Sequence, residues 1–139
     1  MVCLALGRNV EEAGGMESKD LEGRILQGLK KAGVPNAERH LFVCIGPDCC
    51  RGEMGEPLWE HIKQRIRETG AAAMRTKAAC LRVCSGGPWV VVYPEGVWYG
   101  AVTFERFDRI LDEHLIGGKE IAEWVVAKNG VGCDGCLEG

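Results

Sequence analysis

The sequence predicts an α/β domain in which helices flank a mixed β-sheet, and three patterns support this prediction. Strand, helix and strand patterns follow one another between residues 41 and 76, as in a βαβ unit with parallel strands. The β-branched and aromatic runs 89–93 and 97–99 surround Pro94-Glu95-Gly96 and indicate a β-hairpin. Apolar residues at helical spacing between 104 and 115 indicate a last helix.

The predicted βαβ unit begins at a continuous apolar run, residues 41–43, which is expected of a strand buried on both faces. Cys44 stands at the end of this strand, and a loop rich in Gly, Pro and Asp follows. Gly70 ends the next element, a helix whose apolar residues recur at every fourth position: Leu58, Ile62 and Ile66. Residues 72–76 are expected to form the second strand.

The remaining chain predicts a hairpin and a covering helix. After the hairpin, Thr103 is a suitable N-cap for a helix that Gly117-Gly118 ends. Residues 119–126 include apolar side chains that are expected to dock on the domain, and a glycine-rich end follows them. We therefore expect the domain proper to span residues 39–126 and a Gly- and Cys-containing tail to span 127–139.

Residues 1–38 are predicted to form an N-terminal extension that is partly disordered. Its first residues show no periodicity, and Met16 is an alternative start. Residues 20–31 carry apolar side chains at helical spacing and end before Gly33, which predicts a short amphipathic helix.

Composition indicates one globular domain of moderate size. The chain has 139 residues, of which 46% are hydrophobic and 27% charged. Its formal net charge of -3 argues against a binder of nucleic acids, which need a basic surface. The apolar runs are too short to cross a bilayer, and no signal peptide is evident. A cytoplasmic protein without membrane insertion is expected.

Cysteines carry the clearest functional signal. Eight of the 139 residues are cysteines, a share below the roughly 8–10% that marks a disulfide scaffold. Metal binding or redox chemistry is therefore favoured. Cys80 and Cys84 lie on a loop between two predicted strands, and Cys44 ends another strand shortly before the adjacent pair Cys49 and Cys50. Two loops at strand ends are therefore predicted to bring four sulfurs together, which suits a zinc site or an iron–sulfur cluster.

The cysteine motifs and the hairpin resemble one known family. HLFVC at residues 40–44, then a loop, a helix and CLRVCSGGPWVVVYPEGVWYG at 80–100 closely resemble the thioredoxin-like 2Fe-2S ferredoxins. They are also similar to the 24-kDa-type 2Fe-2S subunit of NADH dehydrogenases and hydrogenases. The resemblance covers about Arg39 to Trp124, and its most specific parts are the cysteine pair followed by Gly-Pro and the hairpin after it.

The resemblance implies a thioredoxin-like fold, a 2Fe-2S cluster and one-electron transfer to redox partner proteins. It also implies a homodimer. The expected cluster ligands are Cys44, Cys50, Cys80 and Cys84. Cys50 is favoured as the second ligand because it precedes the apolar pair 58–59 by eight and nine residues, a spacing that family members share. Cys49 remains an alternative.

Other interpretations stay open beside this one. Four thiolates also suit a structural zinc site, so a zinc-stabilised interaction module is an alternative. A fixed electron-transfer subunit of a larger oxidoreductase is another, whereas an isolated enzyme is not expected because no nucleotide or nucleophile motif is present. Cys133 and Cys136 have the spacing of a redox dithiol but lie in the tail. Lys77 and Arg82 flank the second cysteine pair, where positive charge suits an acidic partner or an anionic cluster.

Overall fold

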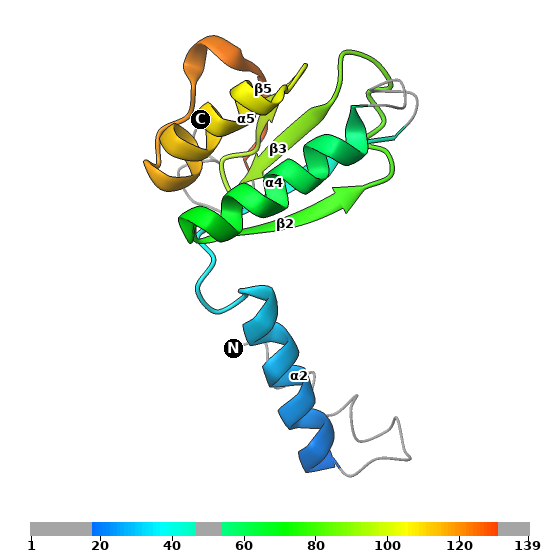
Figure 1. Ribbon diagram of the computed structural model, residues 1–139, viewed down its shortest axis with the longest axis vertical. Helices are drawn as coiled ribbons and strands as arrows, with labels where there is room; N and C mark the ends of the chain where they lie inside the picture. The colour runs from blue at the N-terminus through cyan, green and yellow to red at the C-terminus, as the bar shows by residue number, and fades with distance from the viewer. Residues whose placement is uncertain (1–17, 47–53, 131–139) are drawn as a thin grey trace. The chain divides into compact units, whose positions relative to one another are not determined.

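The computed structural model describes residues 18–46 and 54–130 and divides into two compact units, Met1–Asn36 and Ala37–Gly139. In the first unit, helix α2 (Ser18–Ala32) buries none of its residues completely. It ends before Gly33, whose φ of 90° is the left-handed conformation that closes many helices. The helix predicted for residues 20–31 is confirmed (Figure 1).

The second unit is built on a mixed five-stranded sheet with the strand order β2-β1-β3-β4-β5. β1 and β2 are parallel, and the other neighbouring pairs are antiparallel. The predicted βαβ unit and hairpin are therefore confirmed. The strands are β1 (Arg39–Cys44), β2 (Ala73–Ala78), β3 (Trp89–Tyr93), β4 (Val97–Tyr99) and β5 (Val125–Lys128).

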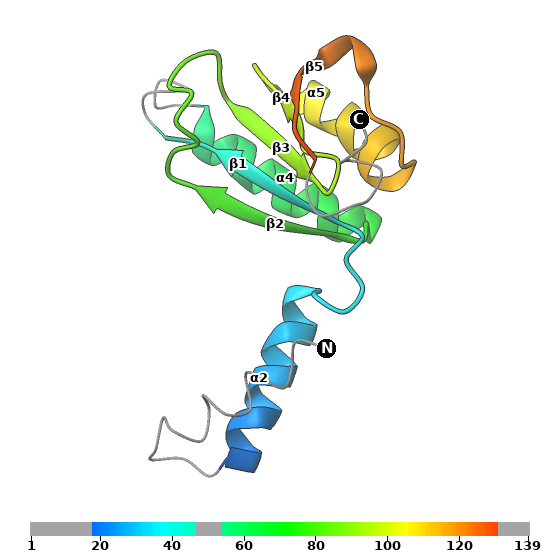
Figure 2. The same ribbon diagram turned by 180° about the vertical axis from the view of Figure 1, so that it is seen from behind.

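The described helices of this unit lie on one face of the sheet. α4 (Gly55–Thr69) and α5 (Phe104–Arg109) lie in front of the strands in Figure 1 and behind them in Figure 2. The prediction that β1 is buried on both faces is wrong. Leu41 and Val43 point into the core, whereas Phe42 is only half-buried on the opposite face, where it stacks on His40.

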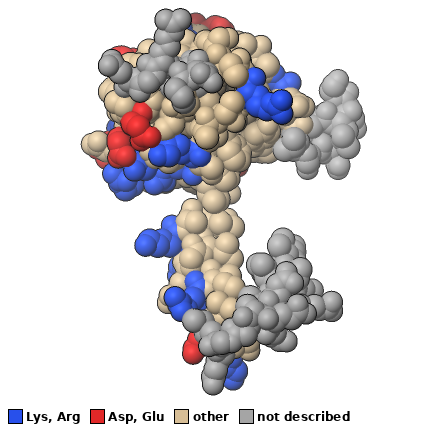
Figure 3. Space-filling view, turned by 90° about the vertical axis from the view of Figure 1, so that its right-hand side faces the viewer, with Lys and Arg blue, Asp and Glu red and all other residues tan. Residues whose placement is uncertain are grey.

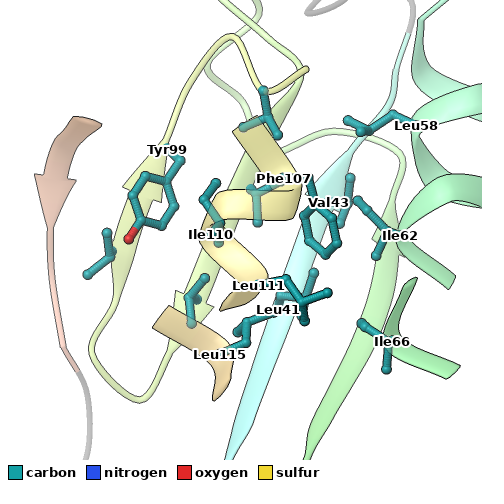
Figure 4. Packing of buried hydrophobic residues seen from close by; sticks show 14 of the residues in the cluster. Leu41, Val43, Leu58, Ile62, Ile66, Tyr99, Phe107, Ile110, Leu111 and Leu115 are labelled. Carbon is teal, nitrogen blue, oxygen red and sulfur yellow. The ribbon is translucent and has the colours of Figure 1, made fainter. Parts of the chain in front are cut away.

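The main core forms where the helices meet this face (Figure 4). Leu58, Ile62 and Ile66 of α4 are buried, so the predicted stripe is confirmed; full burial of such a side chain stabilises the fold by about 2 kcal/mol. The predicted last helix is also confirmed: Thr103 caps α5, which continues as the π-helical segment η1 (Ile110–Ile116). Phe107, Ile110, Leu111 and Leu115 complete the core.

One strand was not predicted from the sequence. After the short 3₁₀ segment η2 (Ala122–Trp124), β5 pairs with β4 and forms an edge of the sheet. Within the described part of the chain, no helix combines the length and apolarity needed to cross a membrane.

A buried polar network joins β1, the β3–β4 turn, β4 and η1. The hydroxyl of Tyr99 forms a hydrogen bond with Nδ1 of His114 at 2.8 Å and accepts one from the backbone N–H of Ile121 at 3.0 Å. On the other side, His114 Nε2 lies 3.4 Å from Glu95, whose carboxylate pairs with Arg39 at 2.9 Å. His114 is fully buried, and this burial lowers its pKa below the ordinary value of 6.5.

This pKa direction predicts that the fold loses stability in mild acid. Below pH 6.5 the unfolded chain gains a proton on His114 that the folded chain does not, so stability falls as the pH falls. The loss from this group is at most about 1.4 kcal/mol per pH unit. Urea denaturation between about pH 7.5 and 5.5 measures it. The free energy of unfolding of His114→Gln should depend less steeply on pH, and equal slopes would contradict the prediction.

Candidate metal centre

The strand order brings cysteines from distant parts of the chain to one end of the sheet. β1 lies between β2 and β3, and its last residue, Cys44, is in register with the end of β2 and the start of β3. The connection from β2 to β3, residues 79–88, must therefore cross the end of β1. Because Cys80 and Cys84 lie on this crossing loop, three cysteines occupy the same end.

The chain that leaves β1 lies very close to the crossing loop. A methyl group on Gly46 would overlap the carbonyl oxygen of Ala79, and the N–H of Ile45 donates to Ala78 O at 3.4 Å. The start of α4 returns to the same place, since a methyl group on Gly55 would lie 2.7 Å from Cβ of Ile45. Both ends of the segment that carries Cys49 and Cys50 are therefore fixed beside Cys44.

The crossing loop has an unusual backbone conformation. Arg82, Cys84 and Gly86 adopt left-handed φ values of 70°, 64° and 73°. Left-handed residues at every second position turn neighbouring backbone N–H groups toward one side. Backbone of this kind forms concave sites for anions, including iron–sulfur clusters. The N–H of Arg82 donates to the sulfur of Cys80 at 3.2 Å. The loop therefore already presents a hydrogen-bond donor to a thiolate.

Burial and charge differ among the residues of this end. Cys44 is 2% exposed, whereas Cys80 and Cys84 are exposed. Of the two predicted basic residues, Lys77 forms an ion pair with Glu56 at 3.3 Å, and Arg82 is exposed. Figure 3 looks onto this end, toward which β2 points in Figure 1. Its described surface is largely uncharged, with charged side chains toward its margins.

Several predicted residues lie outside the part of the chain that the structure describes. These include both candidates for the second ligand, Cys49 and Cys50, and the tail pair Cys133 and Cys136. Among residues 18–46 and 54–130, His, Cys, Asp and Glu form no group of three in metal-binding geometry. The three histidines lie elsewhere: His40 bonds Thr76, His61 pairs with Asp108, and His114 is buried in the core.

Comparison with known proteins identifies relatives of this chain. The chain is 32% identical over 100 residues to a 2Fe-2S ferredoxin of Aquifex aeolicus (strain VF5), a match that covers 65% of this chain and 90% of the relative. It is 32% identical over 95 residues to a 2Fe-2S ferredoxin of Clostridium pasteurianum, covering 62% and 93%. A search of protein-family models finds no match.

A solved structure agrees with these relatives. The wild-type thioredoxin-like [2Fe-2S] ferredoxin from Aquifex aeolicus superposes with a TM-score of 0.57 and 31% identity, covering 66% of this chain and 99% of that one. The chain therefore belongs to the thioredoxin-like [2Fe-2S] ferredoxin family, and the predicted thioredoxin-like α/β fold is confirmed.

The chemistry of the described residues suits the cluster that this family is named for. Cluster binding requires thiolates that converge, backbone donors to sulfur and a loop that bends closely around an anion. Cys44, Cys80 and Cys84 supply thiols at one end of the sheet, and the N–H of Arg82 supplies a donor. The left-handed residues of the crossing loop supply the bend.

Sequence reasoning missed the residues that support the loops. Gly46 and Gly55 lack room for a side chain, and Trp89 fills the space beneath the crossing loop. Glycines beside the cysteine-bearing loops were a signal of close packing, but which distant segments approach each other can be predicted only once the strand order is known. Trp89 was visible in the sequence only as the first residue of a β-branched and aromatic run.

The contact at Gly46 predicts that Gly46→Ala impairs the site. The methyl group would meet backbone, which moves only if the two cysteine loops separate, so iron content and the free energy of unfolding should fall, the latter by about 1–3 kcal/mol. Iron analysis and thermal unfolding measure both. Gly28→Ala is the matched control, because a methyl group there meets nothing within 4 Å. Wild-type iron content in Gly46→Ala would refute the predicted clash.

Proposed function

We propose that the protein is a ferredoxin, a one-electron carrier whose 2Fe-2S cluster is held by Cys44, Cys50, Cys80 and Cys84. The observation that supports this most strongly is that residues 79–88 cross the end of β1, so that Cys44, Cys80 and Cys84 share one end of the sheet in a member of this family. Cys50 comes from the segment between Gly46 and Gly55, whose two ends lie at the same place.

A 2Fe-2S cluster held by these cysteines would supply one-electron redox chemistry between a reduced donor protein and an oxidised acceptor protein. The chain contributes the thiolates and the environment around them. Backbone N–H groups such as that of Arg82 stabilise negative charge on sulfur, which favours the reduced state and raises the potential. The exposure of Cys80 and Cys84 supports a site that opens at the surface, as electron exchange with a partner requires.

We further propose that this carrier is cytoplasmic. This location is supported because a reducing compartment keeps cysteine thiols from forming disulfides. A fixed subunit of a larger oxidoreductase is the second candidate, supported by the resemblance to such subunits. Zinc is not favoured, because the relatives are named 2Fe-2S ferredoxins.

The composition of the purified protein tests the proposed function. After anaerobic purification we expect brown protein with about two irons and two acid-labile sulfides per chain, and visible absorbance that decreases when dithionite adds one electron. Quantification of iron, sulfide and zinc beside an ultraviolet–visible spectrum measures this. Colourless protein with about one zinc per chain would contradict the proposal and favour the zinc-stabilised module.

Serine variants in the same assay separate the two candidates for the second ligand. Cys50→Ser should lose most of its iron, whereas Cys49→Ser should retain the wild-type content and spectrum. The opposite pattern would assign the role to Cys49. Wild-type content in both variants would show that neither residue is required.

We also propose a homodimer, which the family resemblance supports. Sedimentation velocity of the iron-loaded protein should then give one species with about twice the mass of a single chain, independent of concentration over the micromolar range. A species with the mass of one chain under these conditions would rule out a stable homodimer.

A further inference from the structure

Trp89 lies directly beneath the cysteine-bearing loop, apart from the main core. It is the first residue of β3 and is in register with Cys44 across the sheet. Trp89 is 8% exposed and forms a small second core with Cys44. The half-buried residues packed against this core are Ile45, Leu81 and Trp98.

The indole of Trp89 is held on several sides. Its Nε1 donates to the carbonyl oxygen of Ser85, one residue after Cys84, at 2.7 Å. A methyl group on Gly100 would lie 3.0 Å from Cη2 of the indole, and one on Gly86 would lie 3.6 Å from Cζ2. The ring therefore occupies a space that only glycine at position 100 leaves open.

The loop and the chain after β4 are also joined around this ring. The N–H of Ala101 donates to Gly86 O at 2.8 Å, and the N–H of Val102 donates to Pro88 O at 3.0 Å. The indole thus fills the space between the loop that carries Cys84 and the end of β4. On its sheet side it contacts the buried Cys44.

We propose that Trp89 is a positioning residue for the cluster. Its N–H fixes the backbone beside Cys84, and its ring excludes water from the side of the site where Cys44 is buried. The proposal rests on the proposed function and adds a residue that acts through the ligands without binding iron. Neither the cysteine motif nor the relatives' names assign this role.

The physical consequences follow from the two parts of the indole. Trp Nε1 can only donate, so Phe at this position keeps a ring but leaves Ser85 O without this donor. Phe is also smaller, so the loop can move and water can approach sulfur. Residues that support metal ligands typically contribute 10–100-fold to metal affinity. Water stabilises the more negatively charged reduced cluster, so its access should raise the reduction potential.

The test compares Trp89→Phe with the wild type as iron-loaded, full-length proteins. Anaerobic release of iron to a chelator, monitored by visible absorbance, should be about 10-fold faster in the variant. Its midpoint potential in a redox titration should be more positive. A merely structural role would change the melting temperature without changing the potential.

Two further variants make the comparison specific. Trp59→Phe is the matched control, because Trp59 packs on the main core. This substitution should leave the rate of iron release and the midpoint potential unchanged. Gly100→Ala retains the indole but pushes against it, so it should change both values in the same direction as Trp89→Phe. It also tests the proposal if Trp89→Phe does not fold.

The outcomes separate this proposal from the proposed function. Wild-type protein without a 2Fe-2S cluster would overturn both. A clustered wild type with unchanged release rates and potentials in Trp89→Phe and Gly100→Ala would overturn the role of Trp89 alone. Equal changes in Trp59→Phe would also overturn it, because they would report general destabilisation.

Discussion

The structure depends on one topological constraint, the position of β1 between β2 and β3. A loop that joins two strands on either side of a third must cross the end of that third strand. Here the third strand ends in Cys44, and the crossing loop carries Cys80 and Cys84. The main-chain hydrogen bonds of the sheet therefore carry cysteines that lie far apart in the sequence to the same end of the sheet.

The local features of the site follow from the same crossing. Because the loop passes close over the strand end, the chain there has room only for glycine at Gly46. The loop turns back within a few residues, which requires left-handed backbone at positions such as Arg82 and Cys84. Those conformations cost energy in residues other than glycine, and stabilisation from contacts such as the Trp89 hydrogen bond offsets that cost.

Much of the fold could be predicted because local patterns agreed with tertiary burial. The stripe on α4 and the hairpin around Gly96 are determined by spacing and turn chemistry, and both were correct. β5 was missed because Val125–Lys128 is short and mostly exposed, so it is stabilised by pairing with β4 rather than by its own pattern. The placement of the described helices α4 and α5 on one face of the sheet could not be predicted either, since an apolar run such as 41–43 is compatible with burial on one face or two.

The residue type that binds the metal could be predicted from the sequence, but the residues that support the cysteine-bearing loops could not. Cysteine spacing and resemblance indicated the thiols, whereas the choice between Cys49 and Cys50 remains a prediction. The contacts of Gly46 with Ala79 and of Trp89 with Gly100 join segments that only the folded sheet brings together. No periodicity or motif in a single sequence encodes such contacts.

The most direct test of the central claim is a crystal structure of the anaerobically purified protein with anomalous diffraction at the iron edge. The claim predicts an iron signal at the end of β1 that is bound by the sulfurs of Cys44, Cys80 and Cys84. An iron signal away from these sulfurs, or a single zinc bound by them, would contradict it.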